Sequence, residues 1–162
     1  MHPFRDLSPE QLRRHREHVL LRLLIRTSQA ETREVIARLA ARGHTSVQAS
    51  YIGLLANVDT EGTRLVTVAG RVGGTRQAVG QLVKVIEGAG YLERAPDPDD
   101  GRGVLVRHTA AGRALLADAL AAMADIEAGY EAVIGAARMR ALKRSLAEIA
   151  DAFDPRSRLS DR

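Results

Sequence analysis

The chain has 162 residues with a net charge of +4, 45% apolar residues, only 3% aromatic residues and no cysteine. This length suits one ordinary domain, and the missing cysteine excludes a disulfide framework, Cys-ligated zinc and a thiol redox switch. Apolar residues 19–25 are interrupted by Arg22 and are too few to span a bilayer, and the first residues lack a signal-peptide layout. We therefore expect a soluble cytoplasmic protein. The basic residues are almost all arginine, which suits phosphate binding, although high-GC codon bias explains most of that count.

The first forty residues favour helix. Ser8 followed by Pro9 is typical of a helix start, and neither proline nor glycine follows until Gly43, which occupies a C-cap position. We predict one long helix, or two with a break near Thr27–Ser28. Such a helix is too long for a compact core of this size, so we expect it to lie along a partner chain.

The next segment leads into the centre of the chain. Thr45–Ser46 predicts the cap of a short helix that ends near Asn57, and residues 59–62 predict a turn. A strand of two or three residues at 63–65 is expected to pair with a later hairpin. No internal repeat or low-complexity tract is visible.

Residues 65–109 are the most informative stretch. An apolar helix over 65–72, a turn at Gly73–Gly74 and a second helix over 75–90 form a predicted helix-turn-helix. Strands over 91–94 and 104–109, with a loop over 95–103, follow as a basic-tipped hairpin. In this order the second helix enters a DNA major groove, and the hairpin forms a wing beside it.

Helical segments follow the hairpin. Thr109 caps a predicted long helix that Gly129 and Gly135 are in a position to interrupt, and a last helix ends at Asp154–Pro155. The expected fold is mostly α with a small β-hairpin (α+β): a winged helix-turn-helix core at 45–112, an N-terminal dimerisation helix at 1–44 and C-terminal dimerisation helices at 113–162. The ends carry more apolar surface than one small domain hides, which predicts a homodimer.

The helix that begins at Thr75 has two distinct faces. Residues 79, 82, 83 and 86 form an apolar face at helical spacing. The opposite face carries residue types that read DNA, since arginine binds guanine, glutamine pairs with adenine and lysine reaches phosphate. Taken alone, such a face is as often a solvated surface. The expected contacts are Thr75 to the backbone, a close approach at Gly80, and base or phosphate contacts from Arg76, Gln77, Gln81 and Lys84.

The hairpin tip carries Arg102 between two glycines, and an arginine in this place suits a narrow minor groove. Asp99 and Asp100 would oppose DNA binding, because carboxylates repel phosphate. We expect Asp100 to pair with Arg102 or a neighbour and so to fix the tip, although Asp-Asp-Gly is equally a simple turn former.

At these residues the chain resembles the MarR family of bacterial transcription regulators. The resemblance covers about residues 45–117 and rests on three runs: 65–72, the segment from Val79 to Arg94, and most specifically Asp-Pro-Asp-Asp-x-Arg at 97–102 followed by Leu-Val and Thr-x-x-Gly. It implies a homodimeric repressor that binds pseudo-palindromic operators and leaves DNA when a small, often anionic aromatic ligand binds. It also implies that the recognition helix is 75–87 and the wing-tip arginine is Arg102. Gly73–Gly74 and Gly101 depart from the family pattern.

Other chemistry finds little support. His15 and His18 are three residues apart but lack further ligands, and Asp97, Asp99 and Asp100 fall on a predicted exposed turn, so we expect no metal site, no cofactor and no enzyme. His18 and Tyr51 are candidates for lining an effector pocket; a surface histidine and a core tyrosine are the alternatives.

Two functions therefore remain. The first is a ligand-responsive dimeric repressor whose partners are double-stranded DNA and a small-molecule effector. The alternative is a winged-helix protein–protein interaction module without DNA binding, which the Gly-Gly turn and the acidic wing favour. Salt dependence distinguishes them, because phosphate contacts release counterions.

Overall fold

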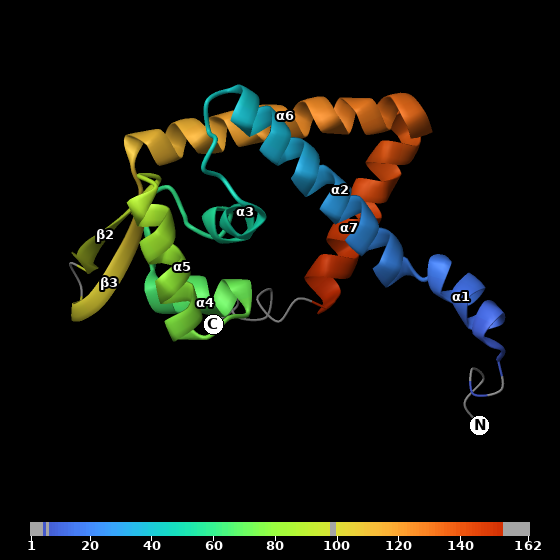
Figure 1. The fold of residues 1–162 in the computed structure, drawn as a ribbon, viewed down its shortest axis with the longest axis horizontal. Helices are drawn as coiled ribbons and strands as arrows, with labels where there is room; N and C mark the ends of the chain where they lie inside the picture. Colours follow the sequence, from blue (N-terminus) through green and yellow to red (C-terminus); the bar gives the residue numbers. More distant parts are fainter. Residues whose placement is uncertain (1–4, 6, 98–99, 154–162) are drawn as a thin grey trace.

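The computed structural model describes residue 5, residues 7–97 and residues 100–153, with the side chains of residues 100–102 left out of the description. Over this part of the chain there are seven helices and a small antiparallel sheet, which lies at one edge of the molecule (Figure 1). The elements are α1 (Pro9–Glu17), α2 (Leu20–Ala41), α3 (Ala49–Leu55), β1 (Thr63–Arg64), α4 (Leu65–Val72), α5 (Arg76–Gly88), β2 (Leu92–Asp97), β3 (Asp100–His108), α6 (Ala110–Ile134) and α7 (Ala136–Phe153).

The N-terminal region is two helices, and the predicted break near Thr27–Ser28 is wrong. Residues 27 and 28 lie inside α2, and the chain bends at His18–Val19 instead, where Val19 is extended. A β-branched residue favours extended backbone, and α1 buries no side chain that would hold it in line with α2. The predicted start at Ser8 is confirmed: its hydroxyl accepts from the Gln11 N–H at 3.2 Å, and the Gln11 side chain accepts from the Ser8 N–H at 2.8 Å.

Helix α3 begins later than predicted. Gln48 is its N-cap, whereas Thr45 and Ser46 lie in the preceding turn. Val47 is buried in the core, which keeps this segment out of the helix. The Ser46 hydroxyl instead donates to the phenolic oxygen of Tyr91 at 3.4 Å. The prediction of a cap at Thr45–Ser46 is therefore wrong, although a short helix does follow.

The sheet has the order β1-β3-β2, and both pairings are antiparallel. Thr63 pairs with Val106, and Leu92 pairs with His108. The short predicted strand before the helix-turn-helix is thus confirmed. The hairpin is longer than predicted, because β2 runs to Asp97 and β3 starts at Asp100, so most of the expected loop over 95–103 is strand. The ladder becomes irregular between Pro96 and Asp97, and Pro96 lies on the edge strand, where a missing N–H is tolerated.

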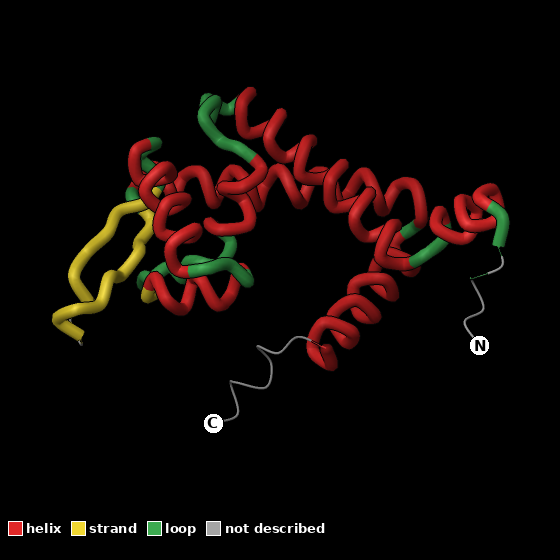
Figure 2. Tube along the Cα trace, turned by 60° about the horizontal axis from the view of Figure 1, so that its bottom comes forward, coloured by secondary structure: helices red, strands yellow, loops and turns green. Residues whose placement is uncertain are grey.

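One core lies where α3, α4 and α5 meet the sheet, and the end of α2 and the start of α6 close it. Its fully buried side chains include Leu39, Leu54, Val83, Ile86 and Val106. In Figure 1 this winged-helix lobe lies on the left and the long α6 runs along the top; α2 crosses α6 and descends to the right, and α7 turns back from the far end of α6. Figure 2 shows the hairpin projecting from the lobe as a strand pair with no helix on its outer side.

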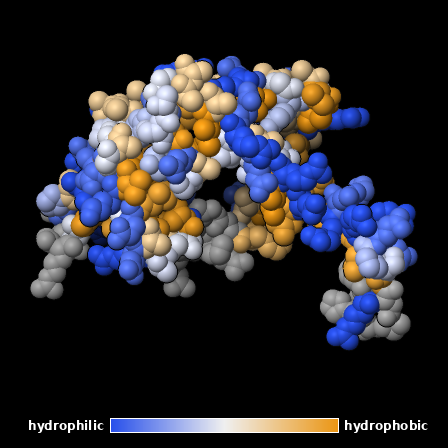
Figure 3. Space-filling model, in the orientation of Figure 1, coloured by the Kyte–Doolittle hydropathy of each residue, from blue (hydrophilic) through white to orange (hydrophobic). Residues whose placement is uncertain are grey.

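Outside the winged-helix lobe, α1, α2, α6 and α7 form a helical arm, of which α6 and α7 are the C-terminal part. The Thr109 hydroxyl accepts from the Gly112 N–H at 3.0 Å, which confirms Thr109 as the cap of α6. Gly129 stays inside the helix, whereas Gly135 ends it with a φ of 85°. No helix in the described part of the chain is long and apolar enough to cross a membrane. Apolar side chains face outward over α7 and the neighbouring part of the arm (Figure 3).

Candidate nucleic-acid interface

The turn between α4 and α5 is tight. Gly73 adopts the left-handed region (φ 68°), as residues that end helices commonly do, and the Gly74 N–H donates to the Ala69 carbonyl at 3.1 Å. A Cβ added at Gly74 would lie 2.9 Å from Val79 Cγ2, so this glycine packs closely against α5. The Gly-Gly sequence therefore gives a defined turn.

Helix α5 begins with the predicted cap. The Thr75 hydroxyl accepts a hydrogen bond from the Ala78 N–H at 3.2 Å. The first turn of α5 is exposed, and it carries Arg76 and Gln77. A helix N-terminus has unpaired N–H groups and a positive dipole end, so this turn suits an anion such as a phosphate.

The two predicted faces of α5 are present. Val79, Val83 and Ile86 are buried, and Leu82 is half-buried against the same core. Among the predicted contact residues, Arg76, Gln77, Gln81 and Lys84 are exposed. Neither Arg76 nor Lys84 forms an ion pair within the part of the chain that the structure describes. Among the described residues, no carboxylate neutralises these two charges.

Gly80 lies at the edge of this face. It is half-buried, and a Cβ added there would lie 3.8 Å from Leu65 Cδ2, an ordinary contact. The fold would thus accept alanine at this position. A glycine here leaves the α5 backbone open beside the first turn of α4.

Ion pairs hold the hairpin at two points, one to α5 and one to β1. Arg94 of β2 forms an ion pair with Glu87 near the end of α5, at 2.7 Å. Arg64 of β1 forms another with Asp97 at the far end of β2. These pairs tie β2 to α5 and to the strand that precedes α4, so they set where the hairpin lies.

The prediction that Asp97 lies on an exposed acidic turn is wrong. Its side chain is only 2% exposed, because it lies under Arg64. The sequence reasoning missed this pair, and also Glu87–Arg94, since they join residues that are 33 and 7 positions apart. Asp99 lies outside the described residues, and so do the side chains of Asp100 and Arg102; the backbone of the latter two belongs to β3.

The two residues predicted to line an effector pocket are not brought together. His18 ends α1 on the exposed arm, where its Nδ1 lies 3.1 Å from the Arg14 carbonyl oxygen. Tyr51 is buried in the core on α3. The structure instead has a cavity beneath α3 that neither residue lines.

Comparison with known proteins identifies the fold. No sequence model of a protein family matches the chain, and no curated protein sequence does. Among solved structures, apo MarR from E. coli is 21% identical, with 81% of this chain and 96% of that chain covered at a TM-score of 0.65. The repressor CouR bound to a 23-mer DNA duplex is 24% identical, with 83% and 94% covered at a TM-score of 0.68.

This chain has the MarR winged helix-turn-helix fold. A third structure with this fold, NadR in complex with 4-hydroxyphenylacetate, is 21% identical, with 82% of this chain and 94% of that chain covered at a TM-score of 0.61. The similarity thus covers 81%, 83% and 82% of this chain in these three structures.

Proposed function

We propose that this chain is a DNA-binding transcriptional regulator of the MarR family, and that it acts in the cytoplasm as a homodimeric repressor. The observation that carries the proposal is the outer face of α5. Its polar and basic side chains lack partners within the described chain, while the opposite face is fixed in the core. An element that is rigid on one side and unpaired on the other suits insertion into a major groove.

The roles of the side chains follow from their chemistry. Arg76, Gln77 and Gln81 would contact base edges, Lys84 a phosphate and Thr75 the DNA backbone. Arg102 of the wing would reach the minor groove, with Asp100 as its support. The braces at Arg94 and Arg64 would hold the wing at a fixed distance from α5.

The dimer is supported by the apolar surface of the arm. Leucine and isoleucine side chains of α1, α2 and α7 remain exposed, and Phe153 at the end of α7 is 80% exposed. Exposed apolar surface on this scale is costly unless a partner covers it. A two-fold dimer would place its two α5 helices about one DNA turn apart, which matches a pseudo-palindromic site.

Regulation by a small molecule is part of the proposal. NadR is described in complex with 4-hydroxyphenylacetate, and PcaV from Streptomyces coelicolor in complex with its natural ligand. In this chain, an effector that binds more tightly to a conformation with misplaced wings would shift the population away from DNA. No catalytic step is assigned to the chain.

The test is a binding titration over a series of salt concentrations, with DNA from upstream of the protein's own gene and a scrambled duplex. Affinity should fall steeply with salt, because each phosphate contact contributes a slope of about 0.9 in the logarithmic plot. The native DNA should bind more tightly than the scrambled one. Equal, weak and nearly salt-independent binding to both would contradict the proposal and would favour a protein–protein module.

Three variants test the assigned roles. Lys84→Ala should weaken binding to native and scrambled DNA alike and reduce the salt slope by about two for a dimer, one contact in each subunit. Arg102→Ala should also weaken binding to all sequences. Gln81→Ala should change base preference, and an equal loss on both duplexes would contradict its role. Arg144→Ala, an exposed arginine on the side of α7 opposite Leu142, provides the control.

A further inference from the structure

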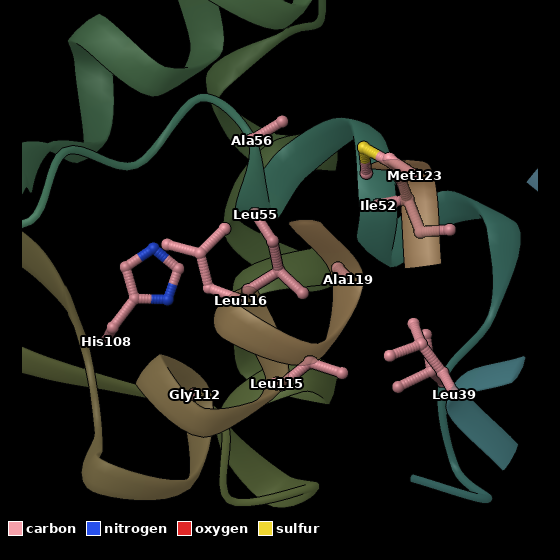
Figure 4. A pocket seen from close by; sticks show the side chains of 11 residues that line it. Leu39, Ile52, Leu55, Ala56, His108, Gly112, Leu115, Leu116, Ala119 and Met123 are labelled. Atoms are coloured by element: carbon pink, nitrogen blue, oxygen red, sulfur yellow. The ribbon is translucent and has the colours of Figure 1, made fainter. Parts of the chain in front are cut away.

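The lobe that carries α5 meets the arm at the end of α2 and the start of α6. Leu39 of α2 and Leu115 and Ala119 of α6 line an apolar cavity of about 40 Å³ at this junction (Figure 4). Apolar contacts have no preferred direction, and side chains around a cavity lack some of their packing partners. Apolar packing alone therefore fixes the angle between the lobe and the arm only loosely.

Tyr91, which directly precedes β2, is bound to both sides of this junction. Its N–H donates to the carbonyl of Ile86 in α5 at 3.2 Å. Its own carbonyl accepts from the N–H of Thr109, the cap of α6, at 3.1 Å. The residue is buried. Whatever holds the side chain of Tyr91 therefore also holds the end of α5 relative to α6.

The Tyr91 hydroxyl lies next to two polar side chains of the loop that follows α2. The Ser46 hydroxyl donates to it at 3.4 Å, and His44 Nδ1 is also 3.4 Å from it. The rings of His44 and Tyr91 are 5.8 Å apart and inclined by 56°, an arrangement in which aromatic rings attract each other. This loop thus contacts Tyr91 through both polar and aromatic interactions.

His44 extends the link to α6. Its Nε2 lies 2.9 Å from Oδ2 of Asp118, and the side chain of His44 is only 14% exposed. Because a carboxylate only accepts, Nε2 donates, and in the neutral ring Nδ1 then accepts from the Tyr91 hydroxyl. Asp118 is itself held in place, since Arg42 Nη1 donates to its carbonyl at 2.7 Å.

Ser46, Tyr91, His44 and Asp118 therefore form one chain of hydrogen bonds, which we call the Tyr91 chain. It joins the end of α5, the loop after α2, and α6. Hydrogen bonds weaken steeply when their angles change, so they restrict rotation at a place where apolar packing does not. The Tyr91 chain is thus suited to fix the angle between the lobe and the arm.

We propose that Tyr91 and His44 are positioning residues, which hold the lobe at a fixed angle to the arm and thereby determine the half-site spacing that the dimer accepts. The inference rests on the proposed function, because it requires a dimer that binds two half-sites. In such a dimer the arms are joined to each other. The distance and relative rotation of the two α5 helices then follow from the angle between each lobe and its arm.

The test measures how strictly the protein requires one spacing. Footprinting on the DNA upstream of the protein's own gene locates the half-sites, and the duplex is then resynthesised with one base pair added or removed between them. One base pair moves a half-site by about 3.4 Å and turns it by about 35°. Wild type should bind either altered duplex about thirtyfold more weakly, because its two α5 helices no longer fit at once. Tyr91→Phe should lose only about threefold, since a lobe that can turn follows its half-site.

A duplex with a single half-site and a matched variant provide the controls. Wild type and Tyr91→Phe should bind the single half-site within about twofold of each other, because the outer face of α5 is unchanged. Tyr130→Phe removes the same atom on α6, where the Tyr130 hydroxyl forms no hydrogen bond with the described residues, and it should keep the wild-type spacing preference. A Tyr91→Phe variant that also loses about thirtyfold on the altered duplexes would overturn the proposal.

Urea unfolding tests the Tyr91 chain without DNA. Tyr91→Phe and His44→Leu should each raise the unfolding equilibrium constant about fivefold, as the loss of a hydrogen bond does. If the chain acts as a unit, the double variant should raise it by clearly less than the product, about twenty-five-fold. Tyr91→Phe keeps the shape of the side chain, so the spacing test remains decisive if His44→Leu does not fold.

The outcomes separate this inference from the proposed function. Independent effects of the two changes on unfolding, or a spacing preference that survives Tyr91→Phe, would defeat the inference alone. A wild-type protein that binds no DNA would defeat the proposed function and the inference with it. A strict spacing preference in wild type and Tyr130→Phe that is lost in Tyr91→Phe would support both.

Discussion

At the scale of single residues, Asp59 holds the turn that leads from α3 into β1. Its Oδ2 accepts from the Arg71 guanidinium at 2.8 Å and from the Thr63 hydroxyl at 3.0 Å. The Arg71 hydrogen bond holds the pKa of the Asp59 carboxyl below its ordinary value of 3.8; partial burial opposes this effect, and Thr63 adds to it. Since Arg71 belongs to α4, the pair fixes the entry to the helix-turn-helix.

A carboxyl whose pKa is lowered on folding stabilises the fold above its unfolded pKa, and this contribution is lost as pH falls through the folded value. Asp59→Asn should therefore lower the free energy of unfolding at pH 7, by less than about 1 kcal/mol because the pair is half-exposed. The deficit should shrink as pH falls below 3.8.

Urea unfolding at a series of pH values from 7 to 3 checks this difference. Glu61→Gln, an exposed acid in the same turn, is the control. A deficit in Asp59→Asn that stays constant across the series would show that the carboxylate charge is not what holds the turn.

At the scale of elements, the start of α6 lies against the residues that follow α5. The Thr109 N–H donates to the Tyr91 carbonyl at 3.1 Å, and a Cβ added at Gly112 would lie 2.0 Å from that same carbonyl oxygen. No side chain fits there without moving one of the two elements. Gly112 therefore sets how closely the arm approaches the winged-helix lobe.

Gly112→Ala should lower the free energy of unfolding by about 2–4 kcal/mol, because the added atom meets backbone that cannot turn aside. Gly129→Ala on the same helix provides the matched control, since its added Cβ would meet nothing within 4 Å. There alanine should raise the free energy of unfolding by about 0.5–1 kcal/mol, because glycine is a poor helix residue. Urea unfolding measures both, and equal effects of the two changes would contradict the close contact.

Elements set by local chemistry could be predicted from the sequence. Ser8, Thr75 and Thr109 cap helices as expected, and Gly73 ends α4, because a cap needs only a neighbouring N–H or a left-handed residue. The bend at His18–Val19 was missed, since no proline or glycine marks it.

Features that depend on distant residues could not be predicted in this way. Asp97 was expected on an exposed turn, but it is buried because Arg64 lies over it after folding. The unpaired Nδ1 of His108 likewise follows from where Val58 and α6 come to lie, and no spacing in the sequence indicates it. The outer face of α5 was predictable as an exposed surface, because helical periodicity alone separates it from the buried face.

At the scale of the whole molecule, the arm carries apolar surface that would be exposed to solvent in a monomer. On α7, Leu142 and Ile149 are each 46% exposed and lie on the same side of the helix as Phe153. The winged-helix lobe already has its own core, so this surface is not needed to fold the lobe. If a second copy of the chain covers this surface, the resulting dimer contains two α5 helices.

Leu142→Glu combined with Ile149→Glu should therefore give a monomer, because two charges would be buried unpaired in the proposed interface. Sedimentation should show wild type at the mass of two chains and the variant at the mass of one. Affinity for a two-half-site operator should fall by about a hundredfold or more, since the second half-site then no longer binds as part of the same particle. Ala147→Glu, on the opposite, exposed side of α7, should leave mass and affinity unchanged. A wild-type monomer, or a double variant that still sediments as a dimer, would rule out α7 as the dimer interface. The apolar face of α7 would then have to be covered by something other than the α7 of a second copy.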